Sequence, residues 1–190
     1  MLPDNLTPKL WTKEAVDHVR KTLDKQIQEQ VDNILSTQQL REDDHRKPET
    51  IYNSTLLSLL TELSVCSWLK GKKNQLTFNA NDPYSYAWDV FALGRRIEVK
   101  KFSSRNFNID PKRRGGGIVD MHSFETFDVA ELIFACKVEI TSDILISPVF
   151  LMTREAYFNC RKPSEQNPGT FYLQYEKESR MNSTNCKVYQ

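Results

Sequence analysis

The sequence predicts an α/β fold in which helices flank a β-sheet and a long helix lies near the N-terminus. Two segments within the first 70 residues repeat apolar side chains every three or four positions, which is the period of an amphipathic helix. Farther along, two short runs rich in aromatic and β-branched side chains flank a glycine, and two longer apolar runs follow between residues 128 and 152. A chain of 190 residues is long enough to bury a core within one domain.

The first predicted helix covers residues 12–40, and Thr12 can cap its N-terminus. Its apolar stripe consists of Val16, Val19, Leu23, Ile27, Val31, Ile34 and Leu35. We expect this stripe to pack against the rest of the domain; the alternative is a coiled-coil seam between two copies, which would make a homodimer.

The segments on either side of this helix are expected to be irregular. Residues 1–11 are interrupted by proline and predict a lead-in, and residues 41–49 are polar and predict a linker. The chain is therefore divided into an N-terminal amphipathic helical segment, residues 1–45, and a core domain, residues 46–190, that ends in a polar tail.

A second helix is predicted over residues 50–70, with Gly71 ending it. Glu62 lies within this otherwise apolar run. From the residues alone, Glu62 can equally be an ordinary exposed acid on the helix surface. Residues 76–79 are expected to form a short strand before the next turn.

A β-hairpin is predicted over residues 84–102, at the centre of the chain. Its two strands, residues 84–93 and 96–102, flank a turn at Gly94. Their aromatic and β-branched content favours strands, and the short separation favours a tight connection between them.

The hairpin is expected to bring acidic side chains together. Side chains alternate along a strand, which puts Glu98 and Lys100 on one face. Val99, together with Ile97, faces the opposite way. If the hairpin closes at the glycine, Asp89 lies roughly opposite Glu98, so that two carboxylates meet beside a lysine.

This combination of side chains suits a metal site. Two carboxylates close together cannot both stay ionised cheaply unless a cation lies between them. Hard oxygen ligands on a rigid strand pair suit Mg²⁺, which binds through one or two carboxylates and keeps several waters. A lysine beside such an ion can orient the attacking water and offset charge on a phosphate. The alternative is a solvated face of Glu98 and Lys100 on an edge strand.

The C-terminal part of the core is predicted to be mostly strand. Residues 128–140 and 143–152 are expected to be core strands, although the first of them also fits a helical period. Thr153 can cap a short helix directly after them. Residues 171–175 predict an edge strand, and residues 181–190 a loose end.

Positive charge is concentrated next to the hairpin. Residues 95–114 contain eight basic and two acidic side chains, whereas the first fifty residues contain eight basic and ten acidic ones. Residues 103–120 are predicted to be a loop, whose glycines and basic side chains suit contacts to phosphates. The alternative is an ordinary solvated loop. The candidate nucleic-acid contacts are Lys101, Arg105, Lys112, Arg113 and Arg114.

At the hairpin the sequence resembles the PD-(D/E)XK nuclease superfamily. The match consists of Asp89, eight intervening residues and the triplet Glu98-Val99-Lys100, preceded by a predicted helix and followed by further predicted strands. Trp88 stands where the pattern has a proline, a position that varies within the superfamily.

The resemblance, which extends over residues 50–160, implies a restriction-endonuclease-like mixed β-sheet flanked by helices. It also implies a metal-dependent nuclease that acts on nucleic acid, with DNA favoured, and Lys100 as the residue that orients the water. The metal would be Mg²⁺, with Mn²⁺ as a substitute, and its implied ligands are Asp89, Glu98, the Val99 carbonyl and Glu62. The alternative is a non-catalytic nucleic-acid-binding or interaction protein on the same fold.

The remaining composition favours a cytoplasmic protein. The four cysteines show no C-x-x-C spacing, and the three histidines show no zinc-ligand spacing. No apolar run approaches the ~20 residues of a membrane span, and the first residues do not resemble a signal segment. We therefore expect reduced thiols and no membrane association.

Overall fold

The computed structural model describes residues 6–38, 46–103, 122–163 and 171–173. Its strands are β1 (Lys9–Trp11), β2 (Lys72–Lys73), β3 (Val90–Ala92), β4 (Arg95–Ser103), β5 (Leu132–Ile140), β6 (Ile144–Thr153), β7 (Arg161–Pro163) and β8 (Phe171–Leu173). Its helices are α1 (Lys13–Gln38), α2 (Pro48–Leu69), α3 (His122–Thr126) and α4 (Arg154–Cys160), together with a 3-10 turn, η1 (Pro83–Ser85).

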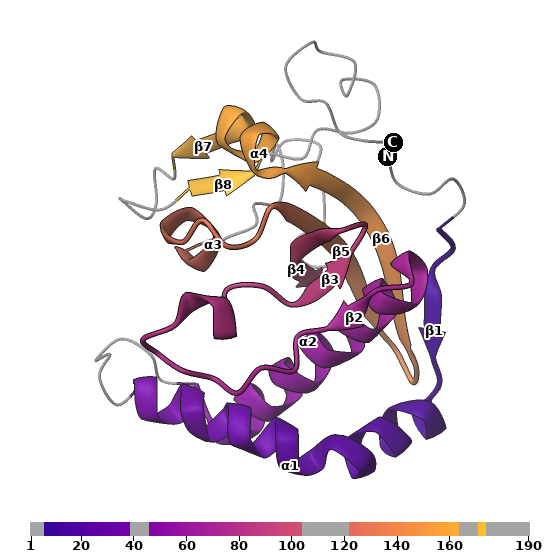
Figure 1. The fold of residues 1–190 in the computed structure, drawn as a ribbon. Helices are drawn as coiled ribbons and strands as arrows, with labels where there is room; N and C mark the ends of the chain where they lie inside the picture. Colours follow the sequence, from indigo (N-terminus) through magenta and orange to yellow (C-terminus); the bar gives the residue numbers. More distant parts are fainter. Residues whose placement is uncertain (1–5, 39–45, 104–121, 164–170, 174–190) are drawn as a thin grey trace.

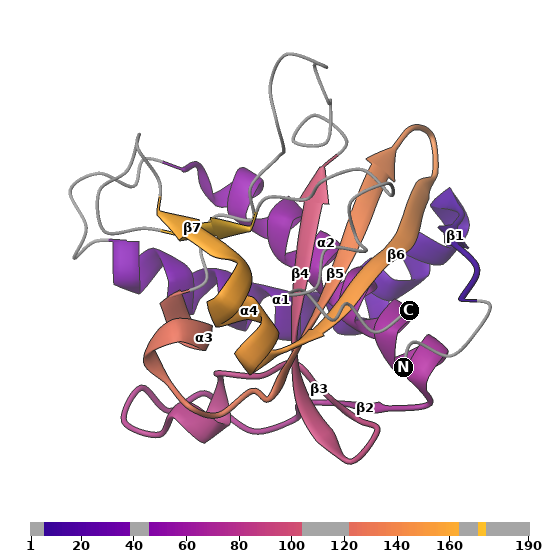
Figure 2. The same cartoon turned by 90° about the horizontal axis from the view of Figure 1, so that it is seen from above.

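Six of these strands form one mixed sheet in the order β1-β6-β5-β4-β3-β2. β4 and β5 run parallel, whereas the other neighbouring pairs are antiparallel. Helices α1 and α2 cover one face of the sheet, and α3 and α4 lie on the other (Figures 1 and 2). β7 and β8 pair separately. The predicted α/β class, with a mixed sheet, flanking helices and a long N-terminal helix, is confirmed.

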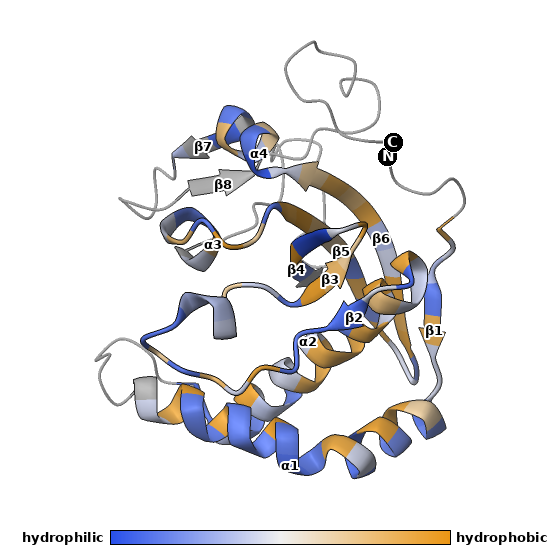
Figure 3. Ribbon diagram, viewed as in Figure 1, coloured by the Kyte–Doolittle hydropathy of each residue, from blue (hydrophilic) through white to orange (hydrophobic). Residues whose placement is uncertain are grey.

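The long first helix packs within the chain, as predicted. It begins after Thr12, whose Oγ1 accepts a hydrogen bond from the Ala15 N–H at 3.3 Å. Its buried side chains Val16, Ile27 and Val31 belong to the core cluster shared with α2 and the sheet. Hydrophilic residues occupy much of the rest of the helix surface (Figure 3). The apolar stripe is therefore covered by the protein's own α2.

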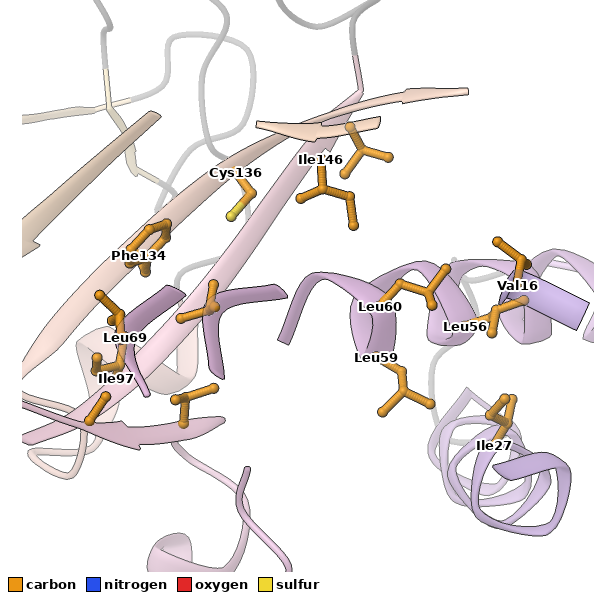
Figure 4. Close-up of a cluster of buried hydrophobic side chains, with 14 of the residues drawn as sticks. Val16, Ile27, Leu56, Leu59, Leu60, Leu69, Ile97, Phe134, Cys136 and Ile146 are labelled. Carbon is orange, nitrogen blue, oxygen red and sulfur yellow. The ribbon is translucent and has the colours of Figure 1, made fainter. Parts of the chain in front are cut away.

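Helix α2 lies between α1 and the sheet, and it is apolar around most of its circumference for that reason (Figure 3). In Figure 4, Leu59 lies on the side of α2 that faces Ile27 of α1, whereas Leu69 lies beside Ile97 and Phe134 of the sheet. All five side chains belong to one buried cluster. A charged residue on a helix in this position needs a partner from another element.

β3 and β4 form the predicted hairpin through a two-residue turn. Leu93 and Gly94 both have positive φ angles, 55° and 70°, as the type I′ turn of a tight hairpin requires. The register pairs Val90 with Ile97. The hairpin and its turn are therefore confirmed.

The first strand of the hairpin is shorter than predicted, so the prediction for residues 84–93 is wrong in its first half. β3 begins only at Val90. Before it, the chain turns through η1, where the Asp82 side chain accepts a hydrogen bond from the Tyr84 N–H at 3.0 Å. The aromatic residues suggest a strand, but a proline after a capping aspartate stabilises a turn instead.

Three short elements also differ from the prediction. The supposed lead-in contains β1, which pairs with β6. Residues 76–79 form no strand; β2 lies a few residues earlier and pairs with β3. Residues 122–126 form the helix α3, for which no element is predicted. Each of these elements is too short to show a clear periodicity in sequence.

The predictions for the C-terminal half are largely confirmed. β5 and β6 form a hairpin around residues 141–143, so the strand interpretation of β5 is right and the helical one is wrong. The Thr153 side chain caps α4 by accepting a hydrogen bond from the Ala156 N–H at 3.1 Å. β8 lies within the predicted edge strand, but it pairs with β7 rather than with the main sheet. Residues 41–45 and 181–190 lie outside the described residues.

Within the described ranges, Cys66 and Cys136 are free thiols. Among the helices that the structure describes, none combines the length and the apolar character needed to cross a lipid bilayer.

The role predicted for Gly71, that it ends α2, is wrong. Lys70, not the glycine, adopts the left-handed conformation that ends the helix, with φ of 51°. Gly71 is instead required by space, because a Cβ there would lie 2.7 Å from the Ala92 Cβ and 2.8 Å from the Phe91 carbonyl oxygen. The missing side chain lets the start of β2 lie close to β3.

We expect neighbouring substitutions at this site to have opposite effects on stability. Gly71→Ala should lower the free energy of unfolding by about 1–3 kcal/mol, because the new methyl group meets backbone as well as side chain. Lys70→Gly should raise it by about 1 kcal/mol, because glycine adopts the left-handed conformation without strain. Urea unfolding of both variants tests this, and a Gly71→Ala protein as stable as wild type would contradict the close approach.

Candidate active site

The candidate site lies where the pairing between β3 and β4 stops. β4 pairs with β5 along its whole C-terminal part, from Ile97 to Ser103. On its other edge, β3 pairs only as far as Ile97. Among the described residues, no strand covers this second edge beyond that point. The register places Asp89, the residue before β3, beside Glu98, as the sequence predicts.

Asp89 occupies the open edge with both its backbone and its side chain. Its N–H donates a hydrogen bond to the Ile97 carbonyl oxygen at 2.9 Å. Its Oδ2 accepts a hydrogen bond from the Val99 N–H at 2.7 Å. Because the N–H and C=O of a strand residue point to the same edge, the Val99 carbonyl also faces the side on which Asp89 lies.

Glu98 and Lys100 share one face of β4 and form an ion pair. The Lys100 Nζ lies 2.8 Å from the Glu98 Oε1, and the glutamate side chain is only 9% exposed. Ile97 and Val99 pack with the core cluster on the α2 side of the sheet. The predicted alternation of β4 is therefore confirmed, and a freely solvated Glu/Lys face is not what the structure shows.

Glu62 approaches the same region from α2. Its Oε2 lies 3.1 Å from the Nζ of Lys73 on β2, and the two side chains are 13% and 15% exposed. An exposed acid on the helix surface is therefore the wrong interpretation of Glu62. Lys73 is not predicted by sequence reasoning, because a two-residue strand carries no signal that would show which helix its side chain meets.

Burial and neighbouring carboxylates raise the pKa of Asp89. Burial raises the pKa of Asp89 well above its ordinary value, and the negative charges of Glu98 and Glu62 raise it further. The hydrogen bond from the Val99 N–H and the charge of Lys100 act in the opposite direction. Asp89 is therefore in an environment that disfavours its charged form unless a cation is added.

Glu62 experiences the same combination of effects. Burial raises its pKa, the ammonium of Lys73 opposes this, and the charge of Glu98 adds to it. Lys101 is a further cation whose charge lowers the pKa of Glu62. The mutual effects show that carboxylates from α2, from the start of β3 and from β4 lie within electrostatic reach of one another.

The available ligands suit a hard divalent cation. Among the described residues, no three side chains of Asp, Glu, His or Cys converge as a complete metal site. What the edge of β4 offers is two carboxylates, Asp89 and Glu98, and the Val99 carbonyl. Mg²⁺ commonly binds through one or two carboxylates and retains water in its remaining positions. A cation stabilises the charged form of crowded carboxylates such as Asp89, whose pKa is raised, so this set of oxygens fits Mg²⁺ or Mn²⁺.

The basic residues predicted to contact nucleic acid are described only in part. The Lys101 Nζ donates hydrogen bonds to the Ser58 and Ser54 hydroxyls of α2, at 2.6 and 3.3 Å. Burial lowers the pKa of Lys101, an effect that the charge of Glu62 opposes. The other four predicted contacts, Arg105, Lys112, Arg113 and Arg114, lie outside the described residues.

Two further arginines of the basic stretch bind a carboxylate of the protein itself. The Arg95 Nη1 lies 2.5 Å from the Glu131 Oε1, and the Arg96 N–H donates to the Glu131 Oε2 at 3.1 Å. These contacts join the start of β4 to the residue before β5. Part of the positive charge of this stretch is therefore paired with a carboxylate of the protein itself.

Comparisons with known proteins point in the same direction as the geometry. A family model described as bacteriophage T4 endonuclease IV matches residues 4–175. The curated protein "Endonuclease IV" from Enterobacteria phage T4 is 32% identical over 65 residues, which is 32% of this chain. The alignment spans 35% of that relative's length, about a third. No solved structure matches the chain significantly.

We expect Asp89→Asn to stabilise the metal-free protein at neutral pH, with a gain that shrinks as the pH falls. The pKa of Asp89 is raised above its ordinary value of 3.8, so the folded state binds more protons than the unfolded state between 3.8 and the raised value. The stability that Asp89 contributes therefore falls as the pH rises through this window. Asparagine keeps an acceptor for the Val99 N–H but carries no charge.

Urea unfolding of wild type and Asp89→Asn, with a chelator present and from about pH 4 to about pH 8, measures this difference. Asp32→Asn, on the exposed surface of α1, is the control and should follow the wild-type curve. A constant offset between wild type and Asp89→Asn across the pH range would show that Asp89 is not forced to bind a proton on folding.

Proposed function

The chain belongs to the bacteriophage T4 endonuclease IV family, and from this premise we propose that it is a divalent-metal-dependent endonuclease that hydrolyses phosphodiester bonds in DNA. The observation that carries the proposal is the carboxylate of Asp89, bound to the Val99 N–H beside the Glu98–Lys100 ion pair. DNA as the substrate follows from the resemblance of these residues to the PD-(D/E)XK superfamily.

Hydrolysis of a phosphodiester needs an attacking water, neutralisation of charge on the phosphoryl oxygens and assistance to the departing oxygen. Asp89, Glu98 and the Val99 carbonyl would hold Mg²⁺ or Mn²⁺. When bound, the ion lowers the pKa of a coordinated water and offsets negative charge in the transition state. The protein's own contribution is to present these oxygens on two adjacent chain segments whose backbones are hydrogen-bonded together.

Lys100 would orient the attacking water. Its ammonium lies 2.8 Å from the Glu98 Oε1, beside one of the carboxylates that would hold the ion. An ammonium at this place also offsets the charge that develops on the phosphoryl group. Lys100 therefore combines positioning with electrostatic stabilisation.

Glu62 would extend the site from the α2 side. Its ion pair with Lys73 holds the carboxylate in a fixed, nearly buried position, and its charge acts on the proton affinity of Asp89. In the proposed enzyme it would accept hydrogen bonds from water around the ion or help to bind the ion directly.

The basic residues would hold the DNA backbone. We assign Arg105, Lys112, Arg113 and Arg114 to phosphate contacts, with Lys101 adding positive charge beside the carboxylates. Such contacts supply affinity and position the strand, but they carry no sequence information.

We expect substitutions in the Asp89, Glu98 and Lys100 set to abolish most cleavage while the fold is retained. Asp89→Asn, Glu98→Gln and Lys100→Met should each lower the rate by about 10²-fold or more, because each removes an interaction that strengthens in the transition state. The measurement uses supercoiled plasmid, linear duplex, single strands and RNA, with and without Mg²⁺.

The neighbouring strand offers a matched control for these variants. Lys137 and Glu139 on β5 form an ion pair of the same spacing, with a distance of 2.9 Å. Lys137→Met and Glu139→Gln should therefore keep wild-type activity. A fully active Glu98→Gln protein would refute the proposed role of the hairpin. A wild-type protein that binds nucleic acid but cleaves none of the substrates would favour the non-catalytic alternative.

Metal binding gives a second expected outcome. Calorimetric titration of the wild-type protein should show Mg²⁺ or Mn²⁺ binding that weakens in Asp89→Asn and in Glu98→Gln, because each variant removes one charged oxygen ligand. Glu139→Gln should bind the metal like wild type. Equal affinity in the Asp89→Asn, Glu98→Gln double variant and in wild type would place the ion elsewhere in the protein.

A further inference from the structure

Asn74 follows β2 directly and is hydrogen-bonded to the segment that carries Asp89. Its backbone N–H donates to the Asp89 carbonyl oxygen at 2.7 Å. Its side-chain Nδ2 donates to the carbonyl oxygens of Trp88, at 3.0 Å, and of Ser85, at 3.2 Å. Its Oδ1 accepts from the Leu76 N–H at 2.9 Å.

These contacts restrain the backbone on both sides of Asp89. The Trp88 carbonyl belongs to the peptide bond before Asp89, and the Asp89 carbonyl belongs to the peptide bond after it. Each peptide unit is planar, so holding both units restricts the φ and ψ angles of the aspartate between them. The Ile97 carbonyl holds the first of these units from the opposite side, by accepting the Asp89 N–H at 2.9 Å. The direction in which the carboxylate leaves the chain is thereby restricted.

An asparagine suits this position for a chemical reason. Its amide offers two N–H donors on one atom and an acceptor on the other. The nitrogen is used by two carbonyl groups and the oxygen by one N–H, so the amide can have only one orientation here. An aspartate has nearly the same shape but has no donor for the carbonyl groups.

The register of β2 explains why this residue reaches the site. β2 pairs Lys72 with Phe91 and Lys73 with Val90, so the next residue, Asn74, lies beside Asp89. The same short segment thus supplies Lys73, which pairs with Glu62, and Asn74, which holds the backbone of Asp89.

We propose that Asn74 is a positioning residue, which directs the Asp89 carboxylate toward the Val99 N–H and the edge of β4. Its effect on cleavage rests on the proposed function, whereas its effect on the geometry of Asp89 does not. Asn74 acts on the reaction only through Asp89 and touches no reacting group itself.

The experiment uses Asn74→Asp and Asn74→Ala in the full chain. The first variant keeps the shape and the acceptor but removes both donors; the second removes the side-chain contacts without adding charge. Asn79→Asp is the matched control, because among the described residues the Asn79 side chain only accepts a hydrogen bond, from the Asn81 N–H at 3.0 Å, and an aspartate retains that bond.

The first readout is the NMR signal and the hydrogen exchange of the Val99 amide, which reports the bond to Asp89 without any need for activity. Asp89→Ala defines the complete loss of this bond. In both Asn74 variants the Val99 amide should shift toward its position in Asp89→Ala and exchange faster than in wild type, whereas Asn79→Asp should match wild type.

The second readout is steady-state cleavage with Mg²⁺ titration. Loss of a residue that orients a metal ligand typically lowers activity or metal affinity by about 10- to 100-fold, so kcat and Mg²⁺ affinity should fall by that amount in the Asn74 variants. KM for the DNA should stay within about threefold of wild type, because no substrate contact is removed.

The outcomes separate the two proposals. A wild-type Val99 amide signal in both Asn74 variants overturns the positioning role, whatever the activity. Altered amide signals with unchanged kcat and Mg²⁺ affinity also overturn it. A wild-type protein without any cleavage refutes the proposed function, and the amide signals then still decide whether Asn74 directs Asp89.

Discussion

The candidate site depends on the hydrogen bond between the Val99 N–H and the Asp89 carboxylate. β3 stops pairing at Ile97, so β4 would otherwise have a backbone donor without a partner on that edge. Leaving a half-buried donor without a partner costs free energy, and the Asp89 Oδ2 supplies the partner at 2.7 Å. One bond therefore completes the pairing of β4 and fixes an acidic oxygen beside Glu98. A longer β3 would satisfy the same N–H, but it would leave no open edge on which substrate or metal could bind.

The nearly buried charges around this bond are not there to stabilise the fold. The Glu62–Lys73 pair joins α2 to β2 with both side chains nearly buried, and removing two charges from water costs free energy that their attraction repays only in part. An apolar pair of similar volume would serve the packing of α2 at least as well. The proposed function explains why the pair lies within electrostatic reach of Asp89 and Glu98.

Strand alternation and turn chemistry made the centre of the site predictable from the sequence. A two-residue turn and a period of two suffice to place Asp89 opposite Glu98 and to put Lys100 on the same face as Glu98. The partners of these residues were not predictable, because Lys73 lies in a strand of two residues and Asn74 directly follows it. The position of that strand depends on how α2 ends and how closely the strand approaches β3. A turn was expected before the hairpin, but its extent was not predictable, since the aromatic residues that follow fit a strand and only the local capping contacts favour η1.

On the proposed function, the charges of the site make binding of the metal and binding of the substrate depend on each other. Three carboxylates, those of Glu62, Asp89 and Glu98, face three ammonium groups, those of Lys73, Lys100 and Lys101. Because the pKa of Asp89 is raised, a divalent cation that binds there competes with a proton. A phosphodiester brings one negative charge and a Mg²⁺ ion two positive ones. The ion and the phosphodiester attract each other when they are bound side by side, so binding of the ion and of the DNA backbone would be mutually supportive.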